Sequence, residues 1–168
     1  KIWRHILNSA GIERFPQYHF DMVRLGIGLH GISATHANLQ PVSSFKTYIS
    51  SIRNVPTDQS IGYGRKSYTT RPSRIAVIPV GYADGLNRHL SNRVGNVFIK
   101  GKRVPIIGNI CMDTCMIDVT DTNATIGDEV EIFGKHILVT ELSEQLGTIP
   151  YEILTGISHR VKRVYYKE

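Results

Sequence analysis

Short runs of β-forming residues, separated at regular intervals by turn residues, constrain this chain more than any other feature. Three examples are "SRIAVIPVGYADG" (73–85), "GNVFIKGKRVPIIGNICMDTCMIDVTD" (95–121) and "GDEVEIFGKHI" (127–137). Turn signals stand at Asn96, Lys100-Gly101, Gly108-Asn109, Gly127-Asp128 and Gly134. Turns about every ten residues are typical of closed or sandwiched all-β domains. The sequence therefore predicts a mainly β domain.

Further elements are predicted on both sides of these runs. In "SSFKTYISSIRNV" (43–55) the residues alternate as in a half-buried strand, with Phe45 and Ile49 on one face and Lys46 and Tyr48 on the other. A helix is expected over 140–146, with Thr140 as N-cap and a stop at Gly147. A second helix from Pro150, followed by an edge strand, is expected at the end.

The first forty residues have a different character and read as α/β material. "HILNSAGIERFP" (5–16) is typical of a strand end that leads into a helix-starting loop. "DMVRLGIGLHGIS" (21–33) is apolar and rich in glycine, which predicts a buried strand with close backbone approaches. We place the domain boundary near residues 38–41.

Composition narrows the function classes. The hydrophobic content of 41% is ordinary for a globular protein, whereas the formal charge of +6 raises the possibility of nucleic-acid binding. The basic residues are scattered, and their densest group, "HRVKR" (159–163), is short, so nucleic-acid binding is disfavoured. A phosphorylated small molecule or an acidic partner fits the same charge. We find no signal-peptide pattern and no apolar run of membrane-spanning length.

The two cysteines predict neither a disulfide framework nor a metal site. Cys111 and Cys115 are too few for a stapled fold, and their spacing places both on one face of a strand, as small buried apolar residues. Nearby Met112, Asp113 and Asp118 do not form a recognisable ligand set.

Two short motifs present a tyrosine next to glycine. In "IGYG", Tyr63 stands between two glycines, which cost backbone order in an ordinary strand. Either the loop holds the phenol out toward a ligand, or Tyr63 is a turn aromatic whose hydroxyl bonds to backbone. Tyr82 of "GYADG" stands at the exit of a strand or in a plain hairpin turn.

"RLGIGLHG" (24–31) suggests an anion site. Its glycines allow the backbone to approach a ligand and to direct N–H groups toward it, although close strand packing explains them equally. A buried Arg24 needs an acceptor. Ser9 is either a phosphate donor or a plain helix cap.

Taken together, seven motifs resemble the C-terminal part of alanine racemases. In order they are "ILNSAGI", "DMVRLGIGLHG", "IGYGRKSYTT", "IPVGYADG", "RVPIIGNICMDTCMIDVTD", "IGDEVEIFG" and "IPYEILTGISHRVKRVY", and together they span nearly the whole chain. The resemblance implies that 1–40 is a C-terminal remnant of a pyridoxal-phosphate-binding TIM-type barrel, carrying its last strands. It implies that 41–168 is the β-barrel-like C-terminal domain.

The resemblance also implies roles for single residues. Tyr63 matches a catalytic tyrosine that exchanges a proton with the substrate in the partner subunit's site. A free phenol titrates near pH 10, so this role requires cationic help. Arg65, Lys66 and Arg88 are near in sequence. The expected pyridoxal phosphate contacts are Ser9, Arg24, Gly26, Ile27 and Tyr151, and the expected substrate contacts are Met112 and Tyr82, with no metal.

By the same resemblance, the whole protein interconverts L- and D-alanine for peptidoglycan as a cytoplasmic homodimer, without nucleic-acid or membrane partners. The lysine that forms the Schiff base with the cofactor matches none of the lysines here, so we expect the segment alone to be inactive. Because the sequence begins with Lys1, we interpret it as a processed product or an excised segment, compatible with an N-terminal fusion to a peptidoglycan-precursor ligase. The alternatives are a serine racemase and a non-catalytic dimerisation or regulatory module.

This chain departs from the family pattern at three positions. Asn109 stands where members often carry arginine, which puts the charge of the entry corridor in doubt. Leu25 and His30 replace the common proline and tyrosine without removing an expected side-chain contact to the cofactor.

Overall fold

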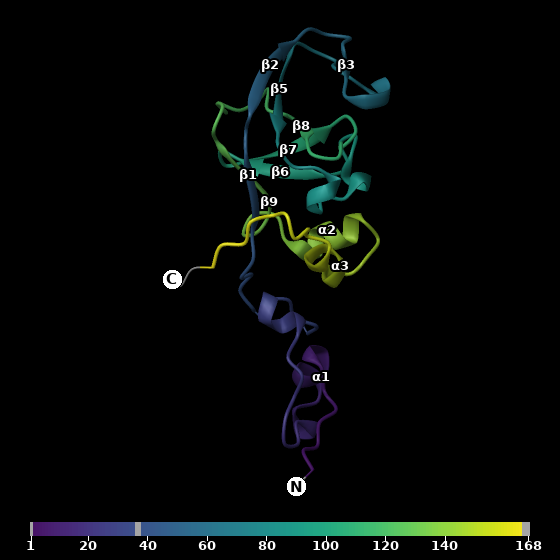
Figure 1. Cartoon of the computed structure of the whole chain (residues 1–168), viewed down its shortest axis with the longest axis vertical. Coiled ribbons are helices and arrows are strands. Elements are labelled where there is room, and N and C mark those ends of the chain that lie inside the picture. Colours follow the sequence, from purple (N-terminus) through teal and green to yellow (C-terminus); the bar gives the residue numbers. More distant parts are fainter. Residues whose placement is uncertain (1, 36–37, 166–168) are drawn as a thin grey trace. The chain divides into compact units, whose positions relative to one another are not determined.

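A computed structural model describes residues 2–35 and 38–165, and it divides the chain into two compact units at Ser44 and Phe45 (Figure 1). Within the described residues, no helix has both the length and the apolar character that crossing a membrane requires.

The first unit is built from short helical turns. α1 (Ser9–Arg14) is followed by the 3-10 turns η1 (Pro16–Tyr18) and η2 (Ile27–His30). α1 begins where predicted, because the Asn8 side chain accepts a hydrogen bond from the Gly11 amide at 3.0 Å.

The buried strand predicted over 21–33 and the strand end predicted at the start of 5–16 are both wrong, since no strand is assigned among the described residues of this unit. Two backbone bonds do join the segments near Arg4–Leu7 and Asp21–Arg24, which run side by side in the same direction. A strand needs a continuing ladder of such bonds. Here the ladder stops, because the chain turns into η2 and leaves it through Gly31 at φ 77°.

The second unit is dominated by one seven-stranded antiparallel sheet, in the order β1-β9-β6-β7-β8-β5-β2. The strands are β1 (Phe45–Tyr48), β2 (Ser51–Val55), β5 (Ser73–Ile78), β6 (Asn96–Ile99), β7 (Lys102–Ile107), β8 (Cys115–Asp118) and β9 (Glu129–Phe133). A separate two-stranded hairpin, β3 (Ser60–Ile61) and β4 (Ser67–Tyr68), is inserted between β2 and β5. The prediction of a mainly β domain is confirmed.

The sheet curls until one chain segment forms both of its ends. β1 pairs with β9 and β2 pairs with β5, and only Ile49 and Ser50 separate β1 from β2. Ile49 N–H donates to the Asp128 carbonyl at 3.0 Å, and Ser50 N–H donates to the Val77 carbonyl at 2.9 Å. The predicted alternation is confirmed, because Phe45 and Ile49 are buried. The closed sheet therefore leaves little exposed strand edge.

The core fills the inside of this curled sheet. Its fully buried members include Ile78, Ile99, Ile106, Ile117 and Val130. α2 (Val139–Gln145) and α3 (Pro150–Thr155) lie beside each other and pack against the core (Figure 1).

The two C-terminal helices and the segment after them differ in part from the prediction. The helix starting at Pro150 is confirmed. Thr140 does not cap α2, because Leu138 stands at the N-cap position and the first turn has no side-chain cap. The predicted edge strand is also wrong, since no strand is assigned over residues 156–165.

Only one of the two cysteines lies on a strand. Cys115 is buried on β8, and burial raises the pKa of its thiol to about 12. Cys111 lies in the preceding turn, where its N–H donates to the Thr114 carbonyl at 2.9 Å. The prediction that both share one strand face is wrong because this turn interrupts the strand.

A buried carboxylate stabilises the turn after β9. Glu131 is 7% exposed and accepts from the backbone N–H groups of His136 at 2.7 Å and Ile137 at 3.2 Å. Its other oxygen lies 3.1 Å from His136 Nδ1. Burial alone would raise the pKa of Glu131, but the hydrogen bonds from His136 and Ile137 outweigh burial and lower it.

Replacing Glu131 by glutamine should lower the free energy of urea unfolding at pH 7 by about 1–2 kcal/mol, because a charged acceptor becomes neutral. A lowered pKa means that this stabilisation is present above the ordinary carboxyl pKa and is lost as the pH falls through the lower folded value. The difference between wild type and variant should therefore shrink as the pH falls below about 4.5. Glu129→Gln, at an exposed ion pair with Lys46, is the control and should change stability little. An equal loss in both variants would contradict the assignment.

Candidate functional site

The β3–β4 hairpin holds Tyr63 outward. The turn η3 (Tyr63–Arg65) joins the two strands, and Gly62 and Gly64 both adopt φ 76°. The Tyr63 side chain is 81% exposed, so it is not packed against its own domain. Glycine at 62 is required by the positive φ, whereas the nearest atom to an added Cβ would be Met116 Cε at 2.8 Å, the flexible end of a side chain that is able to move aside.

Two further loops are joined backbone to backbone, and they carry Tyr82 and Met112. In the turn η4 (Tyr82–Asp84), Tyr82 N–H donates to the Cys111 carbonyl and Ala83 N–H to the Met112 carbonyl, each at 3.0 Å. A Cβ on Gly81 would lie 2.2 Å from the Cys111 oxygen and 2.4 Å from the Met112 oxygen. This backbone clasp therefore requires glycine at 81.

Arg160 ties the C-terminal segment to both of these loops. Its Nε donates to Asp84 at 2.7 Å and its Nη2 donates to Asp113 at 2.6 Å. Asp84 also accepts from the Gly81 N–H at 2.8 Å. Burial alone would raise the pKa of Asp84, but the bonds from Arg160 and Gly81 outweigh it and lower the pKa. Sequence reasoning missed Arg160, whose only signal was the basic group at 159–163.

These loops line a hollow of about 510 Å³ that is open to solvent. Tyr63, Tyr82 and Met112, predicted separately from three motifs, all line it. The other lining residues are Arg88, Asn109, Ile110, Cys111, Asp113 and Thr114. Arg88, in the turn η5 (Arg88–Leu90), is the nearby cation that shares this hollow with Tyr63. The arrangement offers a phenol and a guanidinium to whatever occupies the hollow.

The predicted anion site lies in the first unit. Ser9 is 3% exposed, and its hydroxyl oxygen accepts from the amides of Gly26 at 2.9 Å and Gly28 at 3.2 Å. Because the oxygen accepts both bonds, the hydroxyl hydrogen is still able to donate to a ligand. Ile27 follows Gly26 at the start of η2, and a Cβ on Gly26 would meet only Ser9 Oγ, at 3.8 Å. The backbone here is open to close approach.

Two other predicted residues have their own positions. Arg24 is exposed, which corrects the expectation that it is buried, and its Nη2 donates to the Ile6 carbonyl at 3.0 Å. Tyr151 lies on α3 in the second unit and is 45% exposed. That Tyr151 acts together with Ser9 and Arg24 stays a prediction.

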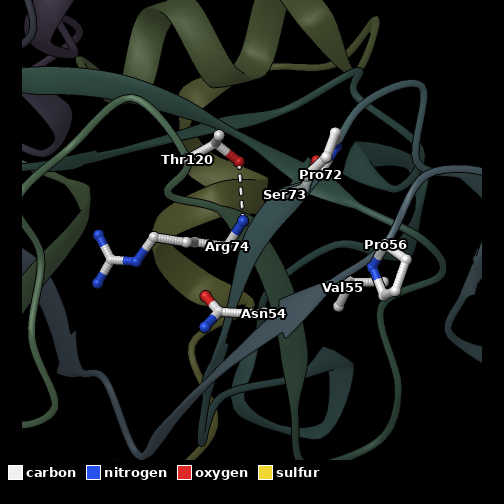
Figure 2. A pocket seen from close by; sticks show the side chains of 7 residues that line it. All are labelled: Asn54, Val55, Pro56, Pro72, Ser73, Arg74 and Thr120. Carbon is white, nitrogen blue, oxygen red and sulfur yellow. Dashed lines mark hydrogen bonds between the residues drawn. The ribbon is translucent and has the colours of Figure 1, made fainter.

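Another hollow, of about 540 Å³, lies where β2 and β5 pair (Figure 2). The side chains of Ser73, Arg74 and Thr120 are engaged within the protein. Arg74 N–H donates to Thr120 Oγ1 at 3.0 Å, and the Arg74 guanidinium donates to the Thr122 and Ala124 carbonyls. Ser73 donates to the Arg71 carbonyl. None of the predicted site residues lines this hollow. No group of three or more metal-binding side chains is found within 2–35 and 38–165.

Comparisons with known proteins agree with one another. Residues 42–165 match the family described as the alanine racemase C-terminal domain. Alanine racemase 2 of Caldanaerobacter subterraneus subsp. tengcongensis is 47% identical over 96% of this chain, and the alanine racemase of Methanococcus maripaludis is 44% identical over 96%. The match covers 44% and 46% of those two proteins, so the chain spans less than half the length of these curated relatives.

Solved structures give the same result. The alanine racemase of Clostridium difficile 630 superposes with a TM-score of 0.92 at 38% identity, covering 98% of this chain and 45% of that one. The alanine racemase of Bartonella henselae, solved with covalently bound pyridoxal phosphate, superposes with a TM-score of 0.91 at 36% identity, covering 99% and 47%.

The backbone clasp at Gly81 predicts a steep cost for adding a single methyl group. Gly81→Ala should lower the free energy of unfolding by about 3 kcal/mol, because two backbone carbonyls have to shift. Gly101→Ala is the control: a Cβ there meets nothing within 4 Å, so only its φ of 77° is strained, at about 1 kcal/mol. Urea unfolding of the two variants measures the difference. An equal loss of stability in the two variants would show that the loops carrying Tyr82 and Met112 are able to move apart without cost.

Proposed function

Because this chain belongs to the alanine racemase family, we propose that it is the C-terminal part of a pyridoxal-phosphate-dependent enzyme that interconverts L- and D-alanine. The resemblance expected from the seven motifs is confirmed. The observation that carries the proposal is the convergence of Tyr63, Tyr82 and Met112 on one hollow.

The exposure of these side chains supports a site completed from outside the second unit. Tyr63, Tyr82 and Met112 are 81%, 45% and 53% exposed, and the phenol stands at the surface on a glycine-flanked turn. A general acid–base group has to reach the proton that it moves. We therefore propose that Tyr63 works on a substrate held by the partner subunit of a homodimer.

We also propose that residues 1–40 are the end of a barrel and that residues 41–168 are the C-terminal domain. The packing of the first unit supports this division. Leu7 is the one buried hydrophobic residue among the described residues of the first unit, whereas Trp3, Ile6, Leu25 and Leu29 are at least half exposed. A stable core needs such side chains removed from water. The side-by-side segments at Arg4–Leu7 and Asp21–Arg24 fit neighbouring barrel strands, which the rest of the enzyme would continue.

The donor groups of the first unit fit pyridoxal phosphate. Ser9 retains a hydroxyl hydrogen that is able to donate to a phosphate, and the space around Gly26 lets a phosphate approach the backbone at Gly26 and Ile27 closely. Arg24 is exposed and permanently charged, so it would donate to the pyridine nitrogen without protonating it. When bound, the cofactor stabilises the negative charge that forms at the substrate Cα.

The residues of this chain then have distinct tasks. Tyr63 takes the Cα proton from L-alanine, or returns one to that same face, while a lysine outside this chain serves the opposite face. The backbone of Met112 binds the substrate carboxylate, so its side chain is free to vary. Tyr82 and Tyr151 narrow the entrance to small amino acids. A smaller residue than Tyr151 would favour a bulkier substrate such as serine, and for this reason we propose alanine.

The metabolic role, the location and the activity of the isolated segment follow from the same proposal. D-Alanine would serve peptidoglycan synthesis in the cytoplasm, and the segment without the lysine would not racemise alone. If the chain were instead a non-catalytic module for dimerisation or regulation, Tyr63 would have no proton to move.

Tyr63→Phe in the full-length protein should abolish racemisation, because phenylalanine carries no transferable proton. Exchange of the Cα hydrogen with solvent deuterium, followed by NMR, should be lost for L-alanine and retained for D-alanine, since only one face loses its base. The absorbance of bound pyridoxal phosphate should not change.

Tyr48→Phe makes the same chemical change on the exposed face of β1 and is the control. It should leave racemisation and both exchange rates unchanged. Normal racemisation by the Tyr63 variant would remove the proposed role, and a wild-type protein without any racemase activity would favour the non-catalytic module.

A further inference from the structure

A chain of side-chain hydrogen bonds connects the Tyr63 turn to the rest of the domain. Asn109 Nδ2 donates to the Tyr63 carbonyl oxygen at 2.7 Å. Asn92 Nδ2 donates to Asn109 Oδ1 at 3.0 Å, and Ser67 Oγ donates to Asn92 Oδ1 at 2.9 Å. The Gly108 N–H donates to Ser67 Oγ at 3.2 Å. We call these four links the amide relay.

All donors of the amide relay point the same way, from the Gly108 N–H to the Tyr63 carbonyl. If either asparagine amide were flipped, oxygen would face oxygen or nitrogen would face nitrogen, so each link fixes the orientation of the next. Bonds in such a series also polarise one another. Asn109 is only 8% exposed, so its bond to Tyr63 competes little with water.

The Tyr63 turn needs this support because its backbone has little intrinsic order. Gly62 and Gly64 have wide conformational freedom, and Arg65 is held at φ 49°, which is unfavourable for a residue with a side chain. Within the turn, the Arg65 N–H reaches the Gly62 carbonyl only at 3.4 Å. The phenol itself is exposed and gains little from packing. An external contact to the Tyr63 peptide therefore decides where the phenol points.

We propose that Asn109 is a positioning residue for Tyr63, and that Asn92 and Ser67 hold Asn109 in the productive orientation. Only the effect of Asn109 on catalysis depends on the proposed function. The ordering of residues 62–66 by the amide relay is a property of the chain itself.

The first test is hydrogen–deuterium exchange on this chain, which requires no activity. Asn109→Asp removes the donor to Tyr63 but keeps the shape and the acceptor for Asn92. Amide exchange in 62–66 should rise on the order of tenfold, as a local opening becomes easier, while the amides of β8 stay protected. Ser67→Ala, which adds no charge, should produce a smaller rise in the same segment.

Asn54→Asp, the same substitution on the exposed face of β2, is the control and should leave exchange in 62–66 unchanged. An unchanged rate in the Asn109 variant would overturn the proposal, as would an equal rise in the Asn54 variant. Should the Asn109 variant fail to fold, Ser67→Ala decides: a rise confined to 62–66 supports the relay, and no rise overturns it.

The second test uses the full-length enzyme. A displaced phenol should lower kcat/KM by about 10–100-fold in Asn109→Asp, and equally in both directions, because L- and D-alanine are equally stable. The deuterium isotope effect should rise with Cα-deuterated L-alanine and fall toward one with the deuterated D-isomer, since only the Tyr63 step is slowed. A loss of properly folded enzyme would change neither isotope effect, so unchanged isotope effects would overturn the catalytic consequence.

The two proposals fail in different ways. If Tyr63→Phe racemises normally while exchange in 62–66 still rises in the Asn109 variant, the relay stands and the proposed function is wrong. If Tyr63→Phe is inactive and exchange does not rise, the function stands and the relay is wrong.

Discussion

Closure of the curled sheet through residues 45–55 is the constraint on which the rest of the second unit depends. One extended segment pairs with β9 through its first half and with β5 through its second half. The hairpin that carries Tyr63 leaves the sheet at the end of β2 and returns at the start of β5. Because β2 and β5 pair over Ser51–Val55, both ends of the hairpin are anchored in the sheet. Without that pairing, neither end of the hairpin that carries Tyr63 would be held by the sheet.

The site is then assembled mainly through backbone contacts. Tyr82 and Met112 are brought together by two amide-to-carbonyl bonds and by the absence of a side chain at Gly81. Arg160 adds charge-assisted bonds to Asp84 and Asp113, which hold the outer ends of the same loops. Tyr82 and Met112 are therefore positioned by backbone contacts that do not involve their own side chains.

Sequence reasoning succeeded where the determining interactions are local and failed where they are distant. The alternation around Phe45 and the exposure of Tyr63 follow from residues next to each other in the chain. The irregular path of 21–33 depends on which segments lie alongside it. Arg160 bonds Asp84 across 76 positions, and Asn109 bonds Tyr63 across 46, so neither partner was visible from local pattern. The cap of α2 failed for a smaller reason, since the helix begins one residue before the Thr140 signal.

Two opposed demands on Tyr63 are met by the glycines on either side of it and by the hydrogen bond from the buried amide of Asn109. Reach requires a turn without side chains on either side of the phenol, and Gly62 and Gly64 provide it at a cost in backbone order. A fixed position of the phenol requires an ordered backbone, and the exposed turn itself does not supply that order. Asn109 approaches from a different loop and bonds the Tyr63 carbonyl, so it adds rigidity without covering the phenol. Reach thus comes from the local sequence of the hairpin, and precision from contacts across the fold.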